Sequence, residues 1–249
     1  MKNAALIIID PQHDFVDKTG ALYVDGATRD IDNTARFLRN HAVDINHLVI
    51  TADDHDFLHI SHPAFWRDSN GNIPAPFTTI TREDFNQKKF TPIGPDFLVK
   101  CYLFGLGTPH IIWPVHCLKN TVGASFHPSI VKEVQGWEVL HGKQATVIRK
   151  GDQQLSEQHS PFSMANSDLT TNFEEMKRLF DYDTVFFAGE AYSHCLKQTV
   201  VDCVRFDMNP KKIVILKNCT SAIKGFDMAE FEKEYKTMGV RFMETGDVV

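Results

Sequence analysis

The sequence contains no long apolar run, no cysteine pair and no cluster of basic residues. The apolar stretch Ala4–Ile9 is too short for a membrane span or for the core of a signal peptide. The five cysteines are irregularly spaced without a C-x-x-C pair, which argues against a disulfide framework or a zinc ribbon. Lys and Arg are dispersed in a chain of formal net charge −6, which argues against nucleic-acid binding. We therefore expect a cytoplasmic protein with reduced thiols that binds a small molecule and neither nucleic acid nor a membrane.

Length and composition favour one α/β domain over residues 1–249. The chain is 43% hydrophobic and 23% charged, which is ordinary for a globular protein, and it has no internal repeat. Short β-branched runs predict strands at Ala5–Ile9, His47–Thr51, Ala145–Arg149, Thr184–Ala188, Lys212–Leu216 and Arg241–Glu244. Amphipathic stretches predict helices near Thr28–His41, Asn172–Phe180, Ser193–Phe206 and Met228–Met238. This alternation predicts a three-layer α/β/α fold around a mostly parallel six-stranded sheet.

Residues 63–110 interrupt that alternation and are expected to be an insertion. The segment is rich in Pro, Gly, Asn and Phe and contains no clear strand–helix unit. Its aromatic residues, among them Phe65, Trp66 and Phe77, are more numerous than a solvated loop needs. We expect part of it to form a wall or lid over the site, or to pack against a neighbouring subunit. The alternative is a surface excursion with a small core of its own.

Polar side chains follow four of the predicted strands directly. Asp10 follows the first, Asp53 and His55 the second, Lys150 the third, and the turn 189–195 the fourth. Because ligands bind outside the carboxyl ends of the strands in such sheets, we expect these residues to converge on one site.

An aspartate, a lysine and a cysteine together provide a proton acceptor, a positive charge and a nucleophile. A helix N-terminus and a nearby ammonium would lower the pKa of the Cys195 thiol, and Asp10 could accept its proton. The competing interpretation is that Cys195 is a core residue. Cys203 suits that role better, because it shares the buried stripe of the following helix with Leu196 and Val200.

A second cluster combines one carboxylate with two imidazoles. Asp53 and His55 lie two residues apart, and His116 follows the insertion in the segment WPVHC. Such ligands suit one divalent ion, with zinc, manganese and iron as candidates and water completing the coordination shell. His59 and His62 are competing ligands because they lie close by in the sequence.

These motifs resemble the cysteine hydrolases of the isochorismatase-like superfamily and, within it, the nicotinamidases. The segments that carry the resemblance are ALIIIDPQHDF, DDH, WPVHCLKNTVGASF, VIRKGDQ and GEAYSHC. The resemblance implies the isochorismatase-like fold, with Asp10, Lys150 and Cys195 as catalytic residues. It also implies a metal site at Asp53, His55 and His116, with zinc as the first expectation.

The same resemblance implies a reaction, namely hydrolysis of nicotinamide to nicotinic acid and ammonia through a thioester on Cys195. The amides of Ala191 and Cys195 would hold the oxyanion, the metal would orient the pyridine ring, and Phe15 and Trp113 would sandwich it. A homo-oligomer is expected.

Two residues depart from the nicotinamidase pattern, since Asp54 replaces a common tryptophan and Glu190 replaces a small or apolar residue. Three alternatives remain: an amidase for another small amide, a hydrolase that uses a metal-bound water while Cys195 is structural, and a binding protein without turnover.

Overall fold

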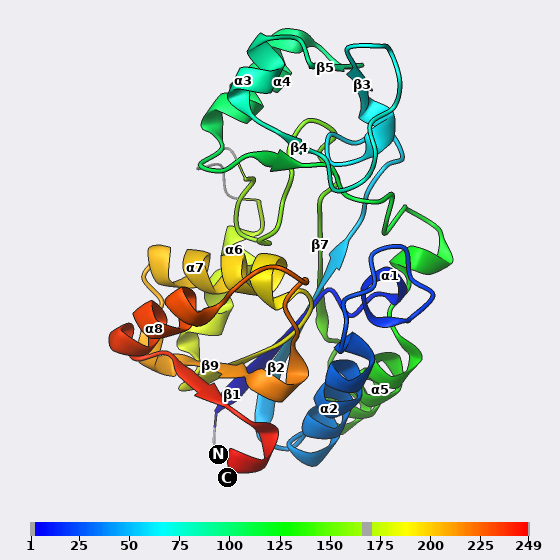
Figure 1. Cartoon of the computed structure of the whole chain (residues 1–249). Coiled ribbons are helices and arrows are strands. Elements are labelled where there is room, and N and C mark those ends of the chain that lie inside the picture. The colour runs from blue at the N-terminus through cyan, green and yellow to red at the C-terminus, as the bar shows by residue number, and fades with distance from the viewer. Residues whose placement is uncertain (1–2, 166–170, 249) are drawn as a thin grey trace.

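The computed structural model describes residues 3–165 and 171–248, and a six-stranded sheet lies at its centre (Figure 1). The strands are β1 (Ala4–Ile9), β2 (Ile45–Asp53), β7 (Thr146–Lys150), β8 (Thr184–Gly189), β9 (Ile213–Leu216) and β10 (Arg241–Met243). They lie in the order β10-β9-β8-β1-β2-β7, and every neighbouring pair is parallel. The predicted six-stranded sheet is therefore confirmed, and it is parallel throughout.

The central strands of this sheet are buried on both sides, because helices cover both of its faces. In β1, Ala4, Leu6 and Ile8 belong to one apolar cluster, whereas Ala5, Ile7 and Ile9 belong to the other. The first cluster includes residues of α2 (Ala27–Asn40) and α5 (Pro128–His141), and the second includes residues of α6 (Phe173–Lys177), α7 (Lys197–Arg205) and α8 (Ala229–Met238). The three-layer α/β/α architecture is confirmed.

The helix predictions were less accurate than the strand predictions. Helix α5 was missed because it has a poorly defined apolar face: Ile130 and Trp137 are its buried residues, while Val139 is 85% exposed. The helix expected at Asn172–Phe180 is α6 followed by a 3₁₀ turn, Arg178–Asp181. The helix expected from Ser193 begins as a π-helical turn, Tyr192–Leu196, which leads into α7. Across residues 3–165 and 171–248, no helix has the length and apolar character needed to cross a membrane.

The segment between β2 and α5 forms a separate lobe beyond the carboxyl ends of the strands (Figure 1). It contains short elements that the sequence did not predict: β3 (Trp66–Asp68), β4 (Thr79–Ile80), α3 (Arg82–Asn86), β5 (Phe90–Pro92), α4 (Asp96–Gly105) and β6 (His110–Ile111). A third apolar cluster, which includes Phe65, Trp66, Val99 and Tyr102, fills this lobe. The insertion therefore has a core of its own, as one of the two expected alternatives required.

Hydrogen bonds join the two ends of this lobe to each other. The amide of Trp113 donates to the carbonyl oxygen of Ser61 over 2.7 Å, and the indole of Trp66 donates to that of Ile60 over 2.6 Å. The carbonyl oxygen of Ile60 also lies 2.9 Å from Nε2 of His110. The lobe is thus closed at its base, where the chain leaves and rejoins the strand ends.

Replacing Trp66 with alanine tests how far the lobe depends on its own core. Trp66 is fully buried, so we expect Trp66→Ala to lower the free energy of unfolding by about 3–5 kcal/mol, measured by urea denaturation. Phe97→Ala is the matched control, because Phe97 is 74% exposed on α4 and its loss should cost less than about 0.5 kcal/mol. Equal stabilities of the two variants would contradict a packed lobe.

Candidate active site

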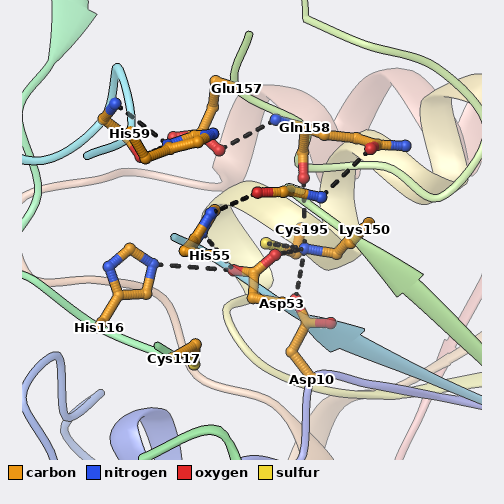
Figure 2. A network of polar contacts seen from close by, with 12 residues as sticks. Asp10, Asp53, His55, His59, His116, Cys117, Lys150, Glu157, Gln158 and Cys195 are labelled. Carbon is orange, nitrogen blue, oxygen red and sulfur yellow. Dashed lines mark hydrogen bonds and ion pairs between the residues drawn. The ribbon is translucent and has the colours of Figure 1, made fainter. Parts of the chain in front are cut away.

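A buried lysine lies at the centre of the side chains that gather at the carboxyl ends of β1, β2, β7 and β8 (Figure 2). The Nζ of Lys150 lies 2.8 Å from Asp10 Oδ2, 2.5 Å from Asp53 Oδ1 and 3.5 Å from Cys195 Sγ. The acidic and sulfur atoms of Asp10, Asp53 and Cys195 all lie within 4.8 Å of one another. The structure thus brings the three predicted catalytic residues together and adds Asp53 to their group.

The lysine remains charged despite its complete burial. Burial by itself lowers the pKa of Lys150, but the charges of Asp10 and Asp53 outweigh it and hold that pKa well above its usual value. For Asp53, burial acts to raise the pKa, but the opposing effects of Lys150 and His55 are larger. They hold the pKa of this carboxyl well below its usual range. The ammonium and the Asp53 carboxylate therefore form a permanent ion pair.

The nucleophile candidate differs from the sequence-based expectation in its protonation. Burial raises the pKa of Cys195 well above that of a free thiol and outweighs the opposing effect of the Lys150 ammonium. Burial also raises the pKa of Asp10, and the nearby Asp53 raises it further, against the lowering effect of Lys150. The lowered pKa that the sequence led us to expect for Cys195 is therefore not found, because burial has the larger effect.

Thr51 and Gln12, which the sequence analysis did not identify, hold these acidic groups in place. The hydroxyl of Thr51 donates to Asp10 Oδ1 over 2.5 Å, and the amide of Asp10 donates to Thr51 Oγ1 over 3.1 Å. The side-chain amide of Gln12 bonds both the N–H and the C=O of Asp53, each over 2.7 Å. Gln12 stands two residues after Asp10, so its position beside the strand end was the only signal in the sequence.

The predicted metal ligands meet on the other side of Asp53. Asp53 Oδ2 lies 3.6 Å from His55 Nε2 and 3.7 Å from His116 Nε2, and all three side chains are buried. Among the described residues, His55 Nε2 has no hydrogen-bond partner. Carboxylate oxygen and imidazole nitrogen are ligands that zinc and other divalent transition metals accept, so these residues fit such an ion.

Both competing histidines are also buried beside this group. The His62 ring lies 5.2 Å from that of His55 and 5.3 Å from that of His116, measured between centroids. The His59 ring lies 4.5 Å from that of His55. Burial lowers the pKa of His59 to about 4 and that of His62 to about 3, so both rings are neutral at ordinary pH.

A small pocket opens onto Cys195 and the metal-ligand candidates. Its lining includes Phe15 and Trp113, the two predicted substrate-binding aromatics, together with Asp53, His116 and Ala191. The Phe15 ring packs edge-on against His116 at 5.4 Å, and Trp113 packs edge-on against His194 at 5.0 Å. The pocket lining therefore combines aromatic and aliphatic side chains with polar ones.

A larger cavity of about 800 Å³ adjoins this pocket and shares four lining residues with it: Trp113, Glu157, His159 and His194. The inserted lobe supplies part of its wall through Tyr102 and residues 105–111. The lobe therefore combines its own core with a wall beside the candidate site.

The nucleophile turn brings the chain unusually close to β1. Gly189 has a φ of +102°, and a Cβ at this position would lie 2.0 Å from the carbonyl oxygen of Ile9, so only glycine fits. The Glu190–Ala191 peptide bond is cis, and the π-helical turn that carries Cys195 follows it. Cys203, by contrast, is fully buried among apolar residues of α7 and its neighbours, as predicted.

Curated relatives of the chain include nicotinamidases from several organisms. A nicotinamidase of Acinetobacter baylyi is 25% identical over 247 residues, which cover 99% of this chain and 95% of the relative. A nicotinamidase of Escherichia coli is 25% identical over 251 residues, which cover 99% and 97%. No family model matches the chain.

Solved structures share the fold. Yeast nicotinamidase bound to the inhibitor nicotinaldehyde has a TM-score of 0.70 at 21% identity, covering 97% of this chain and 99% of that one. An isochorismatase-like hydrolase of Alkaliphilus metalliredigens has a TM-score of 0.57 at 18% identity, covering 99% and 97%. The chain therefore shares the fold of the isochorismatase-like hydrolases. A pyrazinamidase of Pyrococcus horikoshii in complex with zinc also matches, with a TM-score of 0.61 at 21% identity and coverage of 97% and 99%.

One buried and two half-buried polar residues line the pocket without having been expected there: Glu157, His159 and His194. Glu157 and His159 lie in a segment for which no strand or helix was predicted, and His194 lies beside Cys195. The neighbouring Gln158 also contributes, because its carbonyl oxygen accepts a hydrogen bond from Lys150 over 3.3 Å. Residues 157–159 lie outside the recognised motifs, which explains why sequence reasoning missed them.

Glu190, one of the two departures from the nicotinamidase pattern, is a buried carboxyl group. It is 1% exposed, and its Oε1 has no hydrogen-bond partner among the described residues, while Oε2 accepts from the Ser221 amide over 3.2 Å. Burial, and secondarily the charge of Asp30, raise the pKa of Glu190 well above its usual value. The side chain is therefore held in its neutral form.

This raised pKa predicts how stability varies with pH. The folded protein keeps the Glu190 proton to a higher pH than the unfolded chain does, so stability falls as pH rises from about 4.5 toward the folded-state pKa. Glu190→Gln should remove that loss and increase the free energy of unfolding at pH 7.5 by about 1 kcal/mol or more. Urea titrations at several pH values would measure the difference. The exposed Glu230→Gln is the control, and parallel pH profiles for wild type and Glu190→Gln would refute the prediction.

Proposed function

We propose that this enzyme hydrolyses nicotinamide to nicotinic acid and ammonia through a thioester on Cys195. The observation that carries the proposal is one pocket that contains Cys195, beside Asp10 and Lys150, and the donor atoms of Asp53 and His116. Two sequence relatives named nicotinamidase support it, as does the shared fold of a nicotinamidase that binds nicotinaldehyde. Phe15 and Trp113 face the same pocket and would hold a flat aromatic ring between them.

Asp53, His55 and His116 would hold one divalent ion, with zinc as the first candidate. Each imidazole is oriented by a bond from Nδ1 to a backbone carbonyl, at 2.7 Å for His55 and 2.8 Å for His116, which leaves Nε2 directed at Asp53. When bound there, the ion would act as a Lewis acid toward the pyridine nitrogen and so orient the ring. The zinc complex of the matching pyrazinamidase supports this part of the proposal.

Proton transfer from Cys195 to Asp10 begins the reaction. Both groups contact Lys150, so the negative charge moves from one side of the ammonium to the other and the net charge of the cluster stays constant. The resulting thiolate attacks the carboxamide carbon. Backbone amides of Ala191 and Cys195, at the start of the π-helical turn, would donate to the oxyanion.

Collapse of the tetrahedral intermediate breaks the C–N bond. Asp10 returns its proton to the departing nitrogen, which leaves as ammonia, and the acyl group stays on Cys195 as a thioester. Asp10 then accepts a proton from a water molecule that attacks the thioester carbon. Collapse of this second intermediate breaks the C–S bond, Asp10 returns the proton to the departing thiolate, and nicotinic acid leaves. Asp10 thus acts as base and then as acid in each half of the reaction, while Lys150 remains protonated.

Substitution of the two buried cysteines distinguishes nucleophile from core residue. Cys195→Ala should reduce ammonia release from nicotinamide by more than about a thousandfold without unfolding the protein. Cys203→Ala should keep its activity and lose about 1 kcal/mol of stability, because it removes only a small buried side chain. Activity of folded Cys195→Ala within about tenfold of wild type would overturn the proposed mechanism.

Metal content tests the ligand assignment independently of turnover. Elemental analysis of purified protein should find about one divalent ion per chain, as a single site of this kind requires. His116→Ala should lose most of that ion on dialysis against a chelator, whereas His13→Ala, a partly exposed histidine outside the site, should retain it. Full retention by His116→Ala would show that His116 is not a ligand.

A further inference from the structure

The space beside Cys195 does not end with the small pocket. The adjoining cavity of about 800 Å³ shares four lining residues with that pocket, so the two are continuous. A cavity of this volume is the size that proteins use to enclose a ligand of several rings or a ring with a long substituent. Nicotinamide, a single ring with one carboxamide, would occupy the pocket and leave most of the cavity unused.

One wall of the cavity is a polar stripe on the nucleophile turn and α7. The stripe consists of His194, Lys197, Gln198 and Arg205. Spacings of three, four and eleven residues place side chains on the same face of a helix. Cys195, which follows His194 directly, lines the small pocket. The polar stripe therefore begins beside the nucleophile and leads away from it.

The charge of the cavity changes from one end to the other. Lys197 and Arg205 lie on the polar stripe, whereas Glu157, the one acidic residue among the described residues of the lining, belongs to the part shared with the small pocket. Glu157 is buried, and its Oε1 accepts a hydrogen bond from the Gln158 amide over 3.0 Å. The α7 end of the cavity is therefore the positive end.

Lys197 provides a positive charge that the fold itself does not require. Its side chain is half-buried, and its ammonium lies 5.7 Å from the centroid of the Phe231 ring. It pairs with no carboxylate in the part of the chain that the structure describes. An ammonium that is partly shielded from water forms stronger hydrogen bonds with an anion than with a neutral group. The position of Lys197 therefore suits an anionic group of a ligand.

His194 lies where the pocket and the cavity meet. Its ring packs edge-on against Trp113 at 5.0 Å and lies 5.5 Å from the ring of His159. Nδ1 of His194 lies 2.9 Å from the Ser193 hydroxyl, which leaves Nε2 as the nitrogen that can bond a ligand. Burial, and secondarily His159, lower the pKa of His194 to about 3, so the ring is neutral. A substituent that passes from the pocket into the cavity would therefore meet a polar but uncharged group.

We propose that the enzyme acts on an aromatic carboxamide larger than nicotinamide, whose ring carries an anionic substituent that extends into the cavity and binds Lys197. The inference rests on the proposed function, because it keeps the reaction at Cys195 and specifies the class of substrate. His194 and Trp113 would flank the substituent where it leaves the pocket. Carboxylate and phosphonate groups share the chemistry that an ammonium recognises.

The proposal gives the inserted lobe a function in substrate choice. The cavity lies between α7 and the lobe, which supplies Tyr102 and residues 105–111 to its lining. The lobe would thus enclose the substituent against the polar stripe. Because the substituent is remote from the reacting carbon, its binding energy can hold the carboxamide in position beside Cys195 and so increase the rate of the reaction.

Three compounds of similar shape test the requirement for charge. They are nicotinamides that carry at C5 a carboxyethyl, a phosphonoethyl or a neutral hydroxypropyl group. Ammonia release should give at least one of the two anionic compounds a kcat/KM about tenfold or more above that of the neutral one. Lys197→Met keeps an unbranched side chain without the charge, so it should reduce this ratio to about one. Lys233→Met removes the same charge from an exposed position on α8 and should keep the wild-type ratio.

Binding measurements separate this inference from the proposed function. Calorimetry with folded Cys195→Ala should show the preferred anionic compound binding about tenfold or more tightly than the neutral one, without any turnover. A ratio near one for wild type, together with turnover of nicotinamide, would overturn the inference and leave the proposed function intact. An unchanged ratio in folded Lys197→Met would also overturn it. Tighter binding of an anionic compound without hydrolysis of any amide by wild type would support the subsite and refute the proposed function.

Discussion

The buried ammonium of Lys150 is the interaction on which the rest of the site depends. Two carboxylates, Asp10 and Asp53, are 0% and 4% exposed and lie close together, an arrangement that burial and mutual repulsion would oppose. The lysine offsets both effects because its ammonium contacts both carboxylates. Its own burial is possible only because these acids surround it. The three charges therefore form one unit, and removal of the lysine would leave two buried carboxylates without a counter-charge.

The register of the parallel sheet produces this unit. Asp53 and Lys150 are paired residues at the ends of β2 and β7, and Ile9 and Gly189 are paired at the ends of β1 and β8. Asp10 and the cysteine turn thus start from adjacent points on the sheet edge. Apolar residues on both faces hold these strands in place, so the positions of the charged groups follow from packing far from the chemistry.

Much of the architecture could be predicted from the alternation of strands and helices. The composition of the site could be predicted because polar residues stand at or directly after the strand ends. The strand pattern and the parallel sheet were confirmed, and the fold is that of an isochorismatase-like hydrolase. Helix α5 was missed because most of its apolar side chains are not buried, and the lobe was not resolved into elements because its strands have only two or three residues. The pKa of the cysteine was also beyond the sequence: an ammonium beside a thiol suggests a lowered pKa, whereas burial raises that of Cys195. A homo-oligomer and a cytoplasmic location stay predictions.

Asp53 has one oxygen on each side of the site, and this double role has a thermodynamic consequence. Oδ1 bonds Lys150, which holds the proton-exchanging pair Asp10 and Cys195, while Oδ2 faces the imidazoles. A cation at Oδ2 would draw electron density from the carboxylate and weaken its hold on the ammonium, which would then interact more strongly with Asp10 and Cys195. By linkage, the protonation of that pair would in turn alter the affinity for the cation. Occupancy of such a site and the charge on the proposed nucleophile would therefore be thermodynamically coupled.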